Sequence, residues 1–432
     1  MEELEHYMFY LKNTKKRKMR KVYSCKDDFD PTSTTVSNAI RKILSDYSRE
    51  VKVKIPTEEA LSYVLFSDIK SPVNVPNYNN SAMDGYAIHI KSININDEIK
   101  VIDKSLAGKA SKKLPKENEC VKITTGAVMP KNCDAVVMQE EVNIVKSNFI
   151  KINTSKIKKN QNVRFLGEDI KKGDLILNAG KKLNAADIGV ISSMGIKEVF
   201  VYKKPIVSFF TTGDEVRPIS KKLKYGELYD SNRYTIKSLL NKHGIKSIDL
   251  GHAKDSKYSI KNKFTQGIKK SDIILTSGGV SVGEADYIKE VTSKLGRINF
   301  WKVSVKPGRP LTYGKIKNRF FFGLPGNPVS TMITFIIFVL PLIYKMSGDE
   351  LKLNYIDAIT STVLKKRKGR AEFQRGISYI KNGKRFVKGV GSQGSGILSS
   401  MSRANCLIYL DDNTKDQKIG SKVKILELES LI

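Results

Sequence analysis

Apolar side chains between residues 36 and 47 recur every three or four positions, which is the spacing of an amphipathic helix. These side chains are Val36, Ile40, Ile43, Leu44 and Tyr47. A second helix is predicted to start at Thr57, because threonine is a good N-cap and Glu58 and Glu59 suit the positive first turn of a helix. Apolar residues at positions 61, 64 and 65 would form the buried face of this second helix.

Between Ser71 and about Asn162 the pattern changes to short stretches in which apolar and polar residues alternate. These stretches are Glu98–Ile102, Cys120–Ile123 and Ala135–Gln139. Proline, glycine and asparagine residues interrupt them, so this part of the chain is predicted to form a small β-rich domain. A helical pattern returns after Asn184.

From residue 205 onwards, strand-like runs alternate with helix-like runs. The strand-like runs are Ile206–Phe210, Ser247–Gly251 and Asp272–Leu275, and the helix-like runs are Tyr234–Lys242 and Tyr258–Gly267. This alternation is typical of a parallel sheet with crossover helices. The last stretch, 349–432, instead combines short strands with glycine turns, which predicts a small all-β domain.

The longest apolar run of the chain extends from Val329 to Tyr344. Its length is marginal for a membrane span, and it contains three hydroxyl residues and Pro341. Asn327 is a suitable N-cap and Pro328 suits the first helical position. We therefore interpret the run as a buried core helix and expect no membrane association.

The composition first suggests a nucleic-acid partner and then argues against one. The 432 residues provide room for two to four domains of about 100–200 residues each. With 76 Lys and Arg against 44 Asp and Glu, the net charge is +32, which would attract nucleic acid, an anionic membrane or small anions. However, Lys greatly outnumbers Arg, and no nucleic-acid-binding signature is found. We therefore interpret most of the charge as a solvated basic surface and expect no nucleic-acid partner.

The cysteines and the N-terminal residues bear on the cellular compartment. Cys25, Cys120, Cys133 and Cys406 lie far apart and form no CxxC pair, which excludes a disulfide scaffold and a cysteine-based zinc site. Residues 1–30 contain no apolar core of a signal peptide and are predicted to be a flexible basic lead-in. Both observations favour a reducing, cytoplasmic location.

Three glycine-rich loops follow predicted strands of the α/β region. They have the sequences TTGDE at 211–215, TSGGVSVGEADY at 276–287 and GLPGNP at 323–328. Ligands of α/β sheets bind at the carboxyl ends of strands, and glycine turns let backbone N–H groups approach phosphate oxygens closely. Asp214, Glu215 and Asp286 are hard oxygen ligands for a Mg²⁺ ion that bridges phosphates. Lys306 and Arg309, in the sequence KPGRP, are candidates to hold an oxyanion.

These loops belong to a set of nine motifs through which the sequence resembles the molybdopterin molybdenumtransferase family, which is similar to the E domain of gephyrin. The motifs are PNYNNSAMDGYA (76–87), ITTGAVMPKNCDAVVMQEE (123–141), NVRFLGED (162–169), TTGDE (211–215), SGGVSVGEADY (277–287), KPGRP (306–310), GLPGNPVS (323–330), RAEFQRG (370–376) and QGSGILSSMSRAN (393–405). The resemblance runs from near Ile43 to the C-terminus.

The resemblance implies a fold of the class α/β plus β, in an elongated, L-shaped subunit of four domains that forms a homodimer. The expected domains are a discontinuous linking domain (31–73 and 170–203), a β-rich insertion (74–169), a molybdopterin-binding α/β domain (204–347) and a C-terminal small β-barrel (348–432). The lead-in, 1–30, lies outside the resemblance.

The implied reaction inserts molybdate into adenylylated molybdopterin, in the presence of Mg²⁺, and releases AMP. The implied catalytic residues are Asp84, Thr125, Glu168, Asp214, Glu215 and Asp286, of which Glu215 and Asp286 would also hold the metal. The implied contacts to the nucleotide and pterin are Ser277, Gly278, Gly279, Ser281, Pro325, Gly326 and Asn327. The implied contacts to molybdate are Lys306, Arg309, Pro310, Ser330, Arg375 and Ser400. In the family's architecture Asp84, Thr125 and Glu168 face the α/β domain of the partner subunit.

Two departures from the family pattern affect these expectations. Arg309 stands where the family often has lysine, so a planar guanidinium replaces a point charge. Cys406 stands where glycine is common, and we expect a structural role for it. No pterin-adenylylating domain is fused to the chain, so a separate adenylyltransferase would supply the substrate and molybdoenzymes would receive the product.

Two other functions compete with molybdenum insertion. An interaction scaffold of the gephyrin type would have lost its active-site acids, whereas Asp84, Asp214, Glu215 and Asp286 are all present here. A pterin adenylyltransferase has a similar α/β domain but would not need the other three domains.

Overall fold

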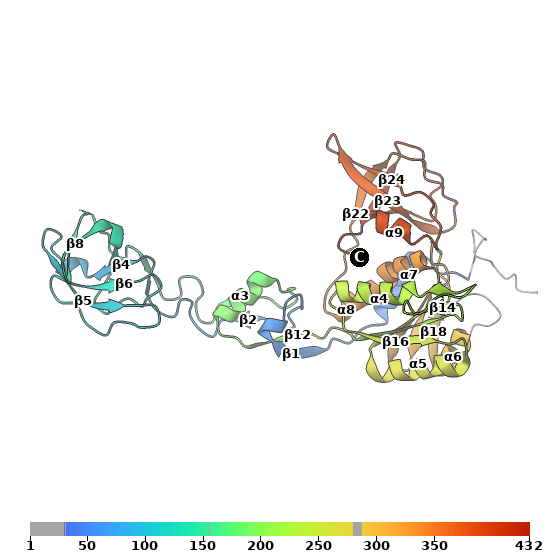
Figure 1. Cartoon of the computed structure of the whole chain (residues 1–432), viewed down its shortest axis with the longest axis horizontal. Helices are drawn as coiled ribbons and strands as arrows, with labels where there is room; N and C mark the ends of the chain where they lie inside the picture. Colours follow the sequence, from blue (N-terminus) through green and yellow to red (C-terminus); the bar gives the residue numbers. More distant parts are fainter. Residues whose placement is uncertain (1–29, 31, 155, 280–286) are drawn as a thin grey trace, which may run out of the picture. The chain divides into compact units, whose positions relative to one another are not determined.

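The computed structural model describes residues 30, 32–154, 156–279 and 287–432 and divides them into two compact units. One unit contains the residues up to Glu50 together with Lys204–Ile432, and the other is Val51–Lys203. The architecture is α/β plus β, as predicted (Figure 1). The predicted site residues Ser281 and Asp286, and the lead-in up to residue 29, lie outside the described residues.

The first unit is built on a six-stranded sheet. Its first four strands, counted from one edge, are parallel to one another. In spatial order its strands are β16 (Ser247–Ala253), β13 (Val207–Thr212), β17 (Ile273–Ser277), β21 (Arg319–Leu324), β20 (Thr312–Ile316) and β18 (Gly296–Phe300). The last two strands run antiparallel to their neighbours. A doubly covered parallel sheet requires strands that are apolar on both faces, and all six residues of β13 are buried.

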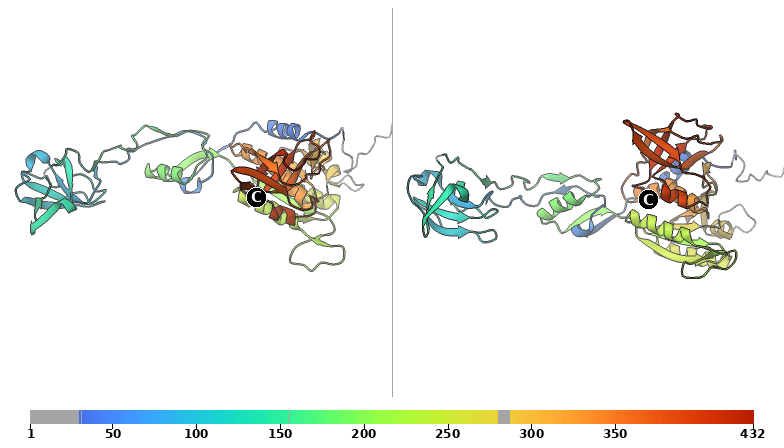
Figure 2. Two further views of the ribbon diagram at one scale, coloured as in Figure 1. Left: turned by 90° about the horizontal axis from the view of Figure 1, so that it is seen from above. Right: turned by 45° about the horizontal axis from the view of Figure 1, so that its top comes forward.

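Helices cover both faces of this sheet (Figures 1 and 2). On one face, α5 (Lys257–Lys270) and α6 (Tyr287–Leu295) pack against Phe210 and its neighbours. On the other face, α4 (Ser231–Lys242) shares a core with Phe209. Helix α2 (Val36–Ser45) places Ala39 and Ile43 in this second core. The α2 helix therefore packs on the α/β domain, whereas we assigned residues 31–73 to the linking domain.

The apolar run forms a continuous helical segment from Pro328 to Met346. It consists of α7 (Pro328–Thr334), a π-helical turn (Phe335–Val339) and α8 (Leu340–Met346). By length and composition alone this segment is apolar enough to cross a membrane, but 89% of its most apolar window is buried inside the structure. Such burial is typical of the core helix of a soluble domain, as the sequence predicted.

The C-terminal region contains a closed five-stranded barrel, shown in red in Figure 2. Its strands are β22 (Tyr355–Thr360), β23 (Ala371–Lys381), β24 (Lys384–Gly389), β25 (Cys406–Leu410) and β26 (Lys422–Glu427), and the short helix α9 (Ser399–Arg403) precedes β25. Pairing between β23 and β25 closes the barrel. Cys406 is fully buried, and burial raises the pKa of its thiol to about 11, in agreement with a structural role.

One strand of the first unit joins the α/β domain to the barrel. The short strand β19 (Val305–Lys306) pairs in parallel with β23, with Lys306 opposite Glu372. Two more short strands, β14 (Val216–Arg217) and β15 (Leu228–Tyr229), pair with each other beyond the end of β13. Because of the β19–β23 pairing, residues from the C-terminal region can contribute to a site of the α/β domain.

The second unit contains three clusters of buried apolar residues among its described residues, two of them on the larger sheet. The larger sheet has the order β7 (Ala135–Met138), β4 (Gly85–Ile88), β6 (Glu119–Ile123), β5 (Ile99–Ser105), β9 (Phe149–Ile152) and β8 (Val142–Lys146), and β3 (Asn80–Ser81) pairs with β10 (Val163–Arg164) beside it. The other core lies among β1 (Lys52–Pro56), β12 (Glu198–Tyr202), β2 (Ile69–Lys70), β11 (Leu175–Leu177) and α3 (Ala185–Ser193). The helix expected after Asn184 is present, with a complete capping box.

The helix predicted to start at Thr57 is wrong. The chain forms only a single 3₁₀ turn, Thr57–Glu59, and Ser62 then takes a positive φ of 64°. Val64 and Leu65 form bridges to other strands, and Leu65 is fully buried in the core of its segment. Three apolar residues with helical spacing were too few to outweigh these long-range pairings.

Candidate functional site

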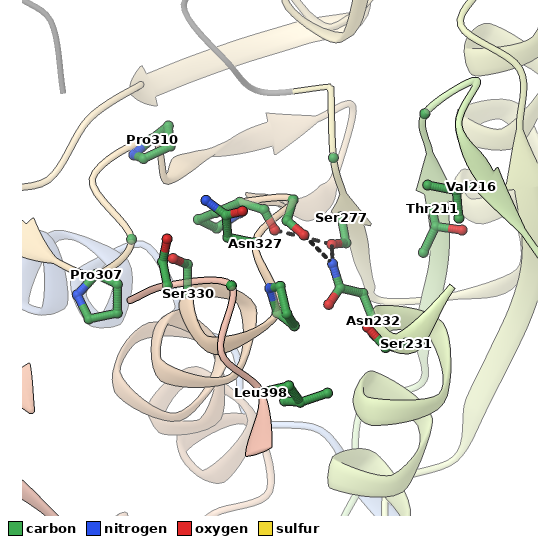
Figure 3. Close-up of a pocket in the computed structure, with 18 of the residues that line it drawn as sticks. Thr211, Val216, Ser231, Asn232, Ser277, Pro307, Pro310, Asn327, Ser330 and Leu398 are labelled. Atoms are coloured by element: carbon green, nitrogen blue, oxygen red, sulfur yellow. Dashed lines mark hydrogen bonds between the residues drawn. The ribbon is translucent and has the colours of Figure 1, made fainter. Parts of the chain in front are cut away.

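A cleft of about 980 Å³ lies at the carboxyl ends of β13, β17 and β21 (Figure 3). All three predicted glycine-rich loops reach it, and so do the KPGRP loop and residues 393–398 before α9. Among the predicted site residues, those that line the cleft are Glu215, Ser277, Gly278, Gly279, Lys306, Arg309, Pro310, Pro325, Gly326, Asn327 and Ser330. The parallel strands thus bring together residues that are more than 100 positions apart in the sequence.

A hydrogen-bond network holds the floor of the cleft (Figure 3). The side-chain amide of Asn232 donates to Ser277 Oγ at 2.8 Å and to the carbonyl of Gly326 at 2.6 Å. Ser277 Oγ in turn donates to the carbonyl of Pro325 at 3.2 Å. Asn232 Oδ1 is buried and has no hydrogen-bond partner within the described part of the chain. It is therefore an acceptor suited to a ligand N–H or O–H group.

Sequence reasoning missed Asn232. Its only local signal is its position two residues after Asp230, which caps the N-terminus of α4 by accepting a hydrogen bond from the Arg233 N–H at 3.1 Å. The capping role accounts for an aspartate at position 230, but it does not indicate the direction in which the Asn232 side chain points. The contact to Ser277 spans 45 residues and depends on the sheet order.

The Gly278–Gly279 turn fits tightly against the end of β13. Gly278 has a φ of +90°, and a Cβ atom on it would lie 2.5 Å from the carbonyl oxygen of Thr212. Gly279 has a φ of +65°, and its Cβ would lie 2.8 Å from Thr212 Oγ1. That hydroxyl oxygen is buried and has no partner among the described residues. The two glycines are therefore required by the backbone. The Gly278 N–H donates to the carbonyl of Leu324 at 3.3 Å, so among the described residues the Gly279 N–H is the amide of this pair left for a ligand.

Acidic side chains gather at one end of the cleft. Glu215 and Asp255 both line it, and the backbone N–H of Asp255 donates to Asp214 Oδ1 at 3.3 Å. Burial and the nearby carboxylates of Asp214 and Glu215 raise the pKa of Asp255. Within the described residues no group of three or more His, Cys, Asp or Glu side chains has metal-binding geometry. Concentrated negative charge at Asp255 nevertheless suits a cation that is also held by ligand oxygens. Asp255 was not predicted from the sequence.

The two cations of the KPGRP loop have different surroundings. The Lys306 side chain is 47% exposed, and its Nζ forms an ion pair with Glu372 Oε1 at 3.1 Å. The Arg309 side chain is 5% exposed, and its guanidinium forms an ion pair with Asp30 Oδ2 at 2.8 Å. Lys306 is therefore the more accessible of the two to an anion in the cleft.

Arg375 and Ser400 do not line the cleft but lie directly behind its wall. Arg375 is 1% exposed, and its guanidinium donates to Ser400 Oγ and to the carbonyl of Gly394, both at 3.1 Å. Gly394 and Gln393 belong to the wall itself. Burial lowers the pKa of Arg375 to about 10. As arranged here, the two predicted molybdate residues support the loop that borders the cleft.

The remaining predicted residues belong to the second unit. Thr125 donates to Asp84 Oδ1 twice, from its backbone N–H at 2.6 Å and from its hydroxyl at 2.9 Å. These bonds lower the pKa of Asp84, which is exposed and ionised. Glu168 is also exposed, and its carboxylate accepts a hydrogen bond from the Phe165 N–H at 2.7 Å, which closes a turn. Asp84 and Thr125 thus form one site despite a separation of 41 residues.

The sequence matches three protein-family models that together cover most of the chain. Residues 34–195 match the MoeA N-terminal region (domain I and II). Residues 208–345 match the model described as "Probable molybdopterin binding domain", and residues 357–428 match the MoeA C-terminal region (domain IV).

Named relatives and solved structures extend over nearly the same residues. The chain is 41% identical to the molybdopterin molybdenumtransferase of Haemophilus influenzae, over 87% of this chain and 93% of the relative. It is 33% identical to gephyrin of Dictyostelium discoideum, over 91% of this chain and 62% of gephyrin. Two crystal structures of the molybdopterin biosynthesis moeA protein from Pyrococcus horikoshii are 28% identical, with TM-scores of 0.76 and 0.69. The alignments cover 92% and 91% of this chain and 99% and 100% of those chains.

Proposed function

Because the chain belongs to the molybdopterin molybdenumtransferase family, we propose that it inserts molybdate into adenylylated molybdopterin during molybdenum cofactor biosynthesis and releases AMP. The observation that carries this proposal is the cleft at the carboxyl ends of β13, β17 and β21. It combines glycine turns, a carboxylate end and a cationic loop in one volume of about 980 Å³. A substrate with a nucleotide, a pyrophosphate link and a second, tetrahedral anion needs these three kinds of contact.

The glycine turns are suited to the nucleotide and pterin part of the substrate. The Gly279 amide carries no side chain that would obstruct it, whereas the Gly278 amide is hydrogen-bonded to the carbonyl of Leu324. Asn232 Oδ1 and Thr212 Oγ1 are buried polar atoms that lack a partner in the described residues. Pro325, Gly326 and Asn327 border the same space. Ligand donors and backbone-bound phosphate oxygens would satisfy these groups.

The carboxylate end is suited to Mg²⁺. Glu215 and Asp255 supply hard oxygen atoms, with Asp214 beside them. The sequence predicts a further contribution from Asp286, which lies outside the described residues. When bound, Mg²⁺ would polarise phosphoryl oxygens of the pyrophosphate link. The chain's own acids would orient the link and exclude competing anions from this end of the cleft.

The opposite end is suited to molybdate. Lys306 provides an accessible positive charge, and Ser330, at the first turn of α7, provides a hydroxyl group in the lining. Pro310 borders the same space, and Arg375 with Ser400 braces the wall behind it. A tetrahedral dianion is recognised by such a combination of charge and short hydrogen-bond donors.

The direct test is AMP release by the purified protein. Adenylylated molybdopterin, Mg²⁺ and molybdate are mixed with the protein, and AMP is quantified by chromatography. We expect AMP to appear only when molybdate is present, and equal release without molybdate would refute the insertion reaction. Transfer of AMP from ATP to molybdopterin would instead identify an adenylyltransferase.

We propose that the enzyme acts in the cytoplasm as a homodimer, with its substrate supplied by a separate adenylyltransferase and its product passed to molybdoenzymes. In such a dimer Asp84, Thr125 and Glu168 serve the cleft of the partner subunit. The hydrogen bonds that keep Asp84 ionised support a role for it as a charged group rather than as a turn residue.

A subunit-mixing experiment tests this sharing. At a molybdate concentration near the wild-type KM, Asp84→Asn and Lys306→Gln should each reduce AMP release to near background. Unfolding and refolding an equimolar mixture should restore about a quarter of the wild-type activity, because half of the dimers are mixed and each has one intact cleft. If Asp84 serves the cleft of its own subunit, both clefts of a mixed dimer carry a substitution and the mixture stays inactive.

A further inference from the structure

Asp30 is a buried carboxylate that lies ahead of the residues covered by the family models, which begin at residue 34. Its side chain is 1% exposed. Thr32 donates to Asp30 Oδ1 from its backbone N–H at 2.9 Å and from its hydroxyl at 2.6 Å. Burial alone would raise the pKa of Asp30, but the bonds from Thr32 and the charge of Lys302 lower this pKa to about 2. Asp30 is therefore ionised at any physiological pH.

The second oxygen of Asp30 holds two cations of the α/β domain. Lys302 Nζ lies 3.2 Å from Asp30 Oδ2, and Arg309 Nη2 lies 2.8 Å from the same atom. These two cations stand at either end of the segment that contains Lys306. The Asp30 carboxylate thus joins Lys302 and Arg309, which lie on either side of Lys306 in the sequence.

Backbone hydrogen bonds reinforce the same junction. The Thr34 N–H donates to the carbonyl of Lys302 at 3.2 Å, and the Ser304 N–H donates to the carbonyl of Thr34 at 2.7 Å. Within the loop, the N–H groups of Val303 and Leu311 both donate to the carbonyl of Arg309 at 2.9 Å. The segment 303–311, which borders the cleft (Figure 3), is therefore held together at its two ends by hydrogen bonds to the Arg309 carbonyl.

Lys306 lies in strand β19 within this segment and is held from the barrel instead. Its partner Glu372 is 4% exposed and accepts a further hydrogen bond from Gln374 Nε2 at 3.0 Å. Lys306 keeps nearly half of its side chain accessible, whereas the Arg309 side chain is 5% exposed. Of the two cations of the KPGRP sequence, Lys306 is therefore accessible to an anion in the cleft, whereas Arg309 is nearly inaccessible.

We propose that Asp30 is a positioning residue for the anion end of the cleft: it holds the Arg309 guanidinium in the wall, so that Arg309 braces the loop and Lys306 is the loop's cation that meets molybdate. This inference rests on the proposed function for the identity of the anion. It assigns Arg309 a role through Asp30 rather than a direct contact with molybdate, and it extends the site to a residue outside the family models.

The physical basis is the cost of a buried charge without a partner. Breaking a buried ion pair by neutralising one member leaves the other charge desolvated and unpaired. Without the Asp30 carboxylate the Arg309 guanidinium loses the anion that holds it in the wall, and the resulting shift of the loop displaces Lys306. Neutralising both members removes the buried Asp30–Arg309 pair and leaves only Lys302, which is partly exposed, without the Asp30 carboxylate, so the double variant should be no worse than Asp30→Asn alone.

The experiment compares Asp30→Asn, Arg309→Gln, the double variant and Lys306→Gln in the AMP-release assay. We expect each of the first three to raise the KM for molybdate by about ten- to a hundredfold, the range found when groups that orient a ligand-binding side chain are removed. The KM for adenylylated molybdopterin should stay within twofold of wild type. Lys306→Gln should raise the KM for molybdate more. Asp30→Asn should have little further effect in the Lys306→Gln background, because it acts through the position of Lys306.

Glu427→Gln is the matched control, because Glu427 pairs with Arg385 at 2.8 Å on the barrel and does not line the cleft. It should leave both KM values unchanged. If Arg309 contacts molybdate directly, Asp30→Asn frees the guanidinium and lowers the KM for molybdate, and the effects of Asp30→Asn and Arg309→Gln do not coincide. Either result overturns the proposal.

Hydrogen exchange gives a readout that does not depend on the reaction. In the full-length protein without substrate, Asp30→Asn should speed amide exchange in residues 302–311, while Glu427→Gln should not. Unchanged exchange in residues 302–311 would contradict the positioning role of Asp30, even if the enzyme is fully active. Failure of wild-type protein to release AMP would refute the proposed function and leave the exchange result to decide the role of Asp30.

Discussion

Gly278→Ala should abolish AMP release and lower the free energy of unfolding by about 2–4 kcal/mol. The backbone of Gly278 has a φ of +90°, which is strained for any L-residue with a side chain. The added Cβ would also lie 2.5 Å from the carbonyl oxygen of Thr212, and neither β13 nor β17 can retreat within a sheet that is buried on both faces. The turn must therefore shift, which breaks the bond from the Gly278 N–H to the carbonyl of Leu324 and moves the Gly279 amide out of the position that a phosphate needs.

Gly396→Ala is the control for this prediction. Gly396 lines the same cleft, has no positive φ, and a Cβ on it would meet nothing within 4 Å. Chemical denaturation and the AMP-release assay should find this variant close to wild type. A Gly278→Ala protein with wild-type stability and turnover would show that the turn is free to rearrange, and the role given to its backbone amides would then be wrong.

The positions of the three glycine-rich loops were predictable because each follows a strand that is apolar on both faces. Carboxyl ends of neighbouring parallel strands meet at one edge of a sheet, so the loops after β13, β17 and β21 had to lie close together. Motifs of glycine and acidic residues after such strands can be recognised in the sequence even when the order of the strands in the sheet is unknown. Lys306 was predictable for a similar reason, since KPGRP is a compact motif.

Asn232, Asp255 and Asp30 were not predictable from the sequence, because their roles depend on which segment packs opposite them. Asn232 reaches Ser277 only because β13 and β17 are neighbours. Asp30 reaches Arg309 across a part of the sequence that includes the whole second unit. The failed helix at Thr57 has the same origin, since pairings of Val64 and Leu65 with distant strands outweighed a short local pattern. Arg375 was assigned to the cleft by its motif, but the structure buries it behind residues 393–394.

Arg375→Ala should have the largest effect on stability of any single substitution in the C-terminal region. Arg375 is the largest fully buried side chain of the described residues, and it makes two hydrogen bonds to Ser400 and Gly394. Truncation leaves a cavity together with two groups that lose their donor, a combination that costs about 3–5 kcal/mol. Because Gly394 borders the cleft, the loop 393–396 should also loosen and AMP release should fall below detection.

Arg375→Lys separates the effect on stability from the effect on AMP release. Lysine keeps the positive charge but cannot reproduce the fork of the guanidinium, so it can satisfy Ser400 or Gly394 but not both in the same geometry. We expect a folded protein with AMP release reduced by about 10²-fold, as for other small displacements of a substrate-positioning group. Arg403→Ala, an exposed arginine of α9, should leave stability and activity unchanged. If Arg375→Ala instead melts like wild type and only the KM for molybdate rises, Arg375 contacts the anion itself, and the loop 393–396 does not need it as a brace.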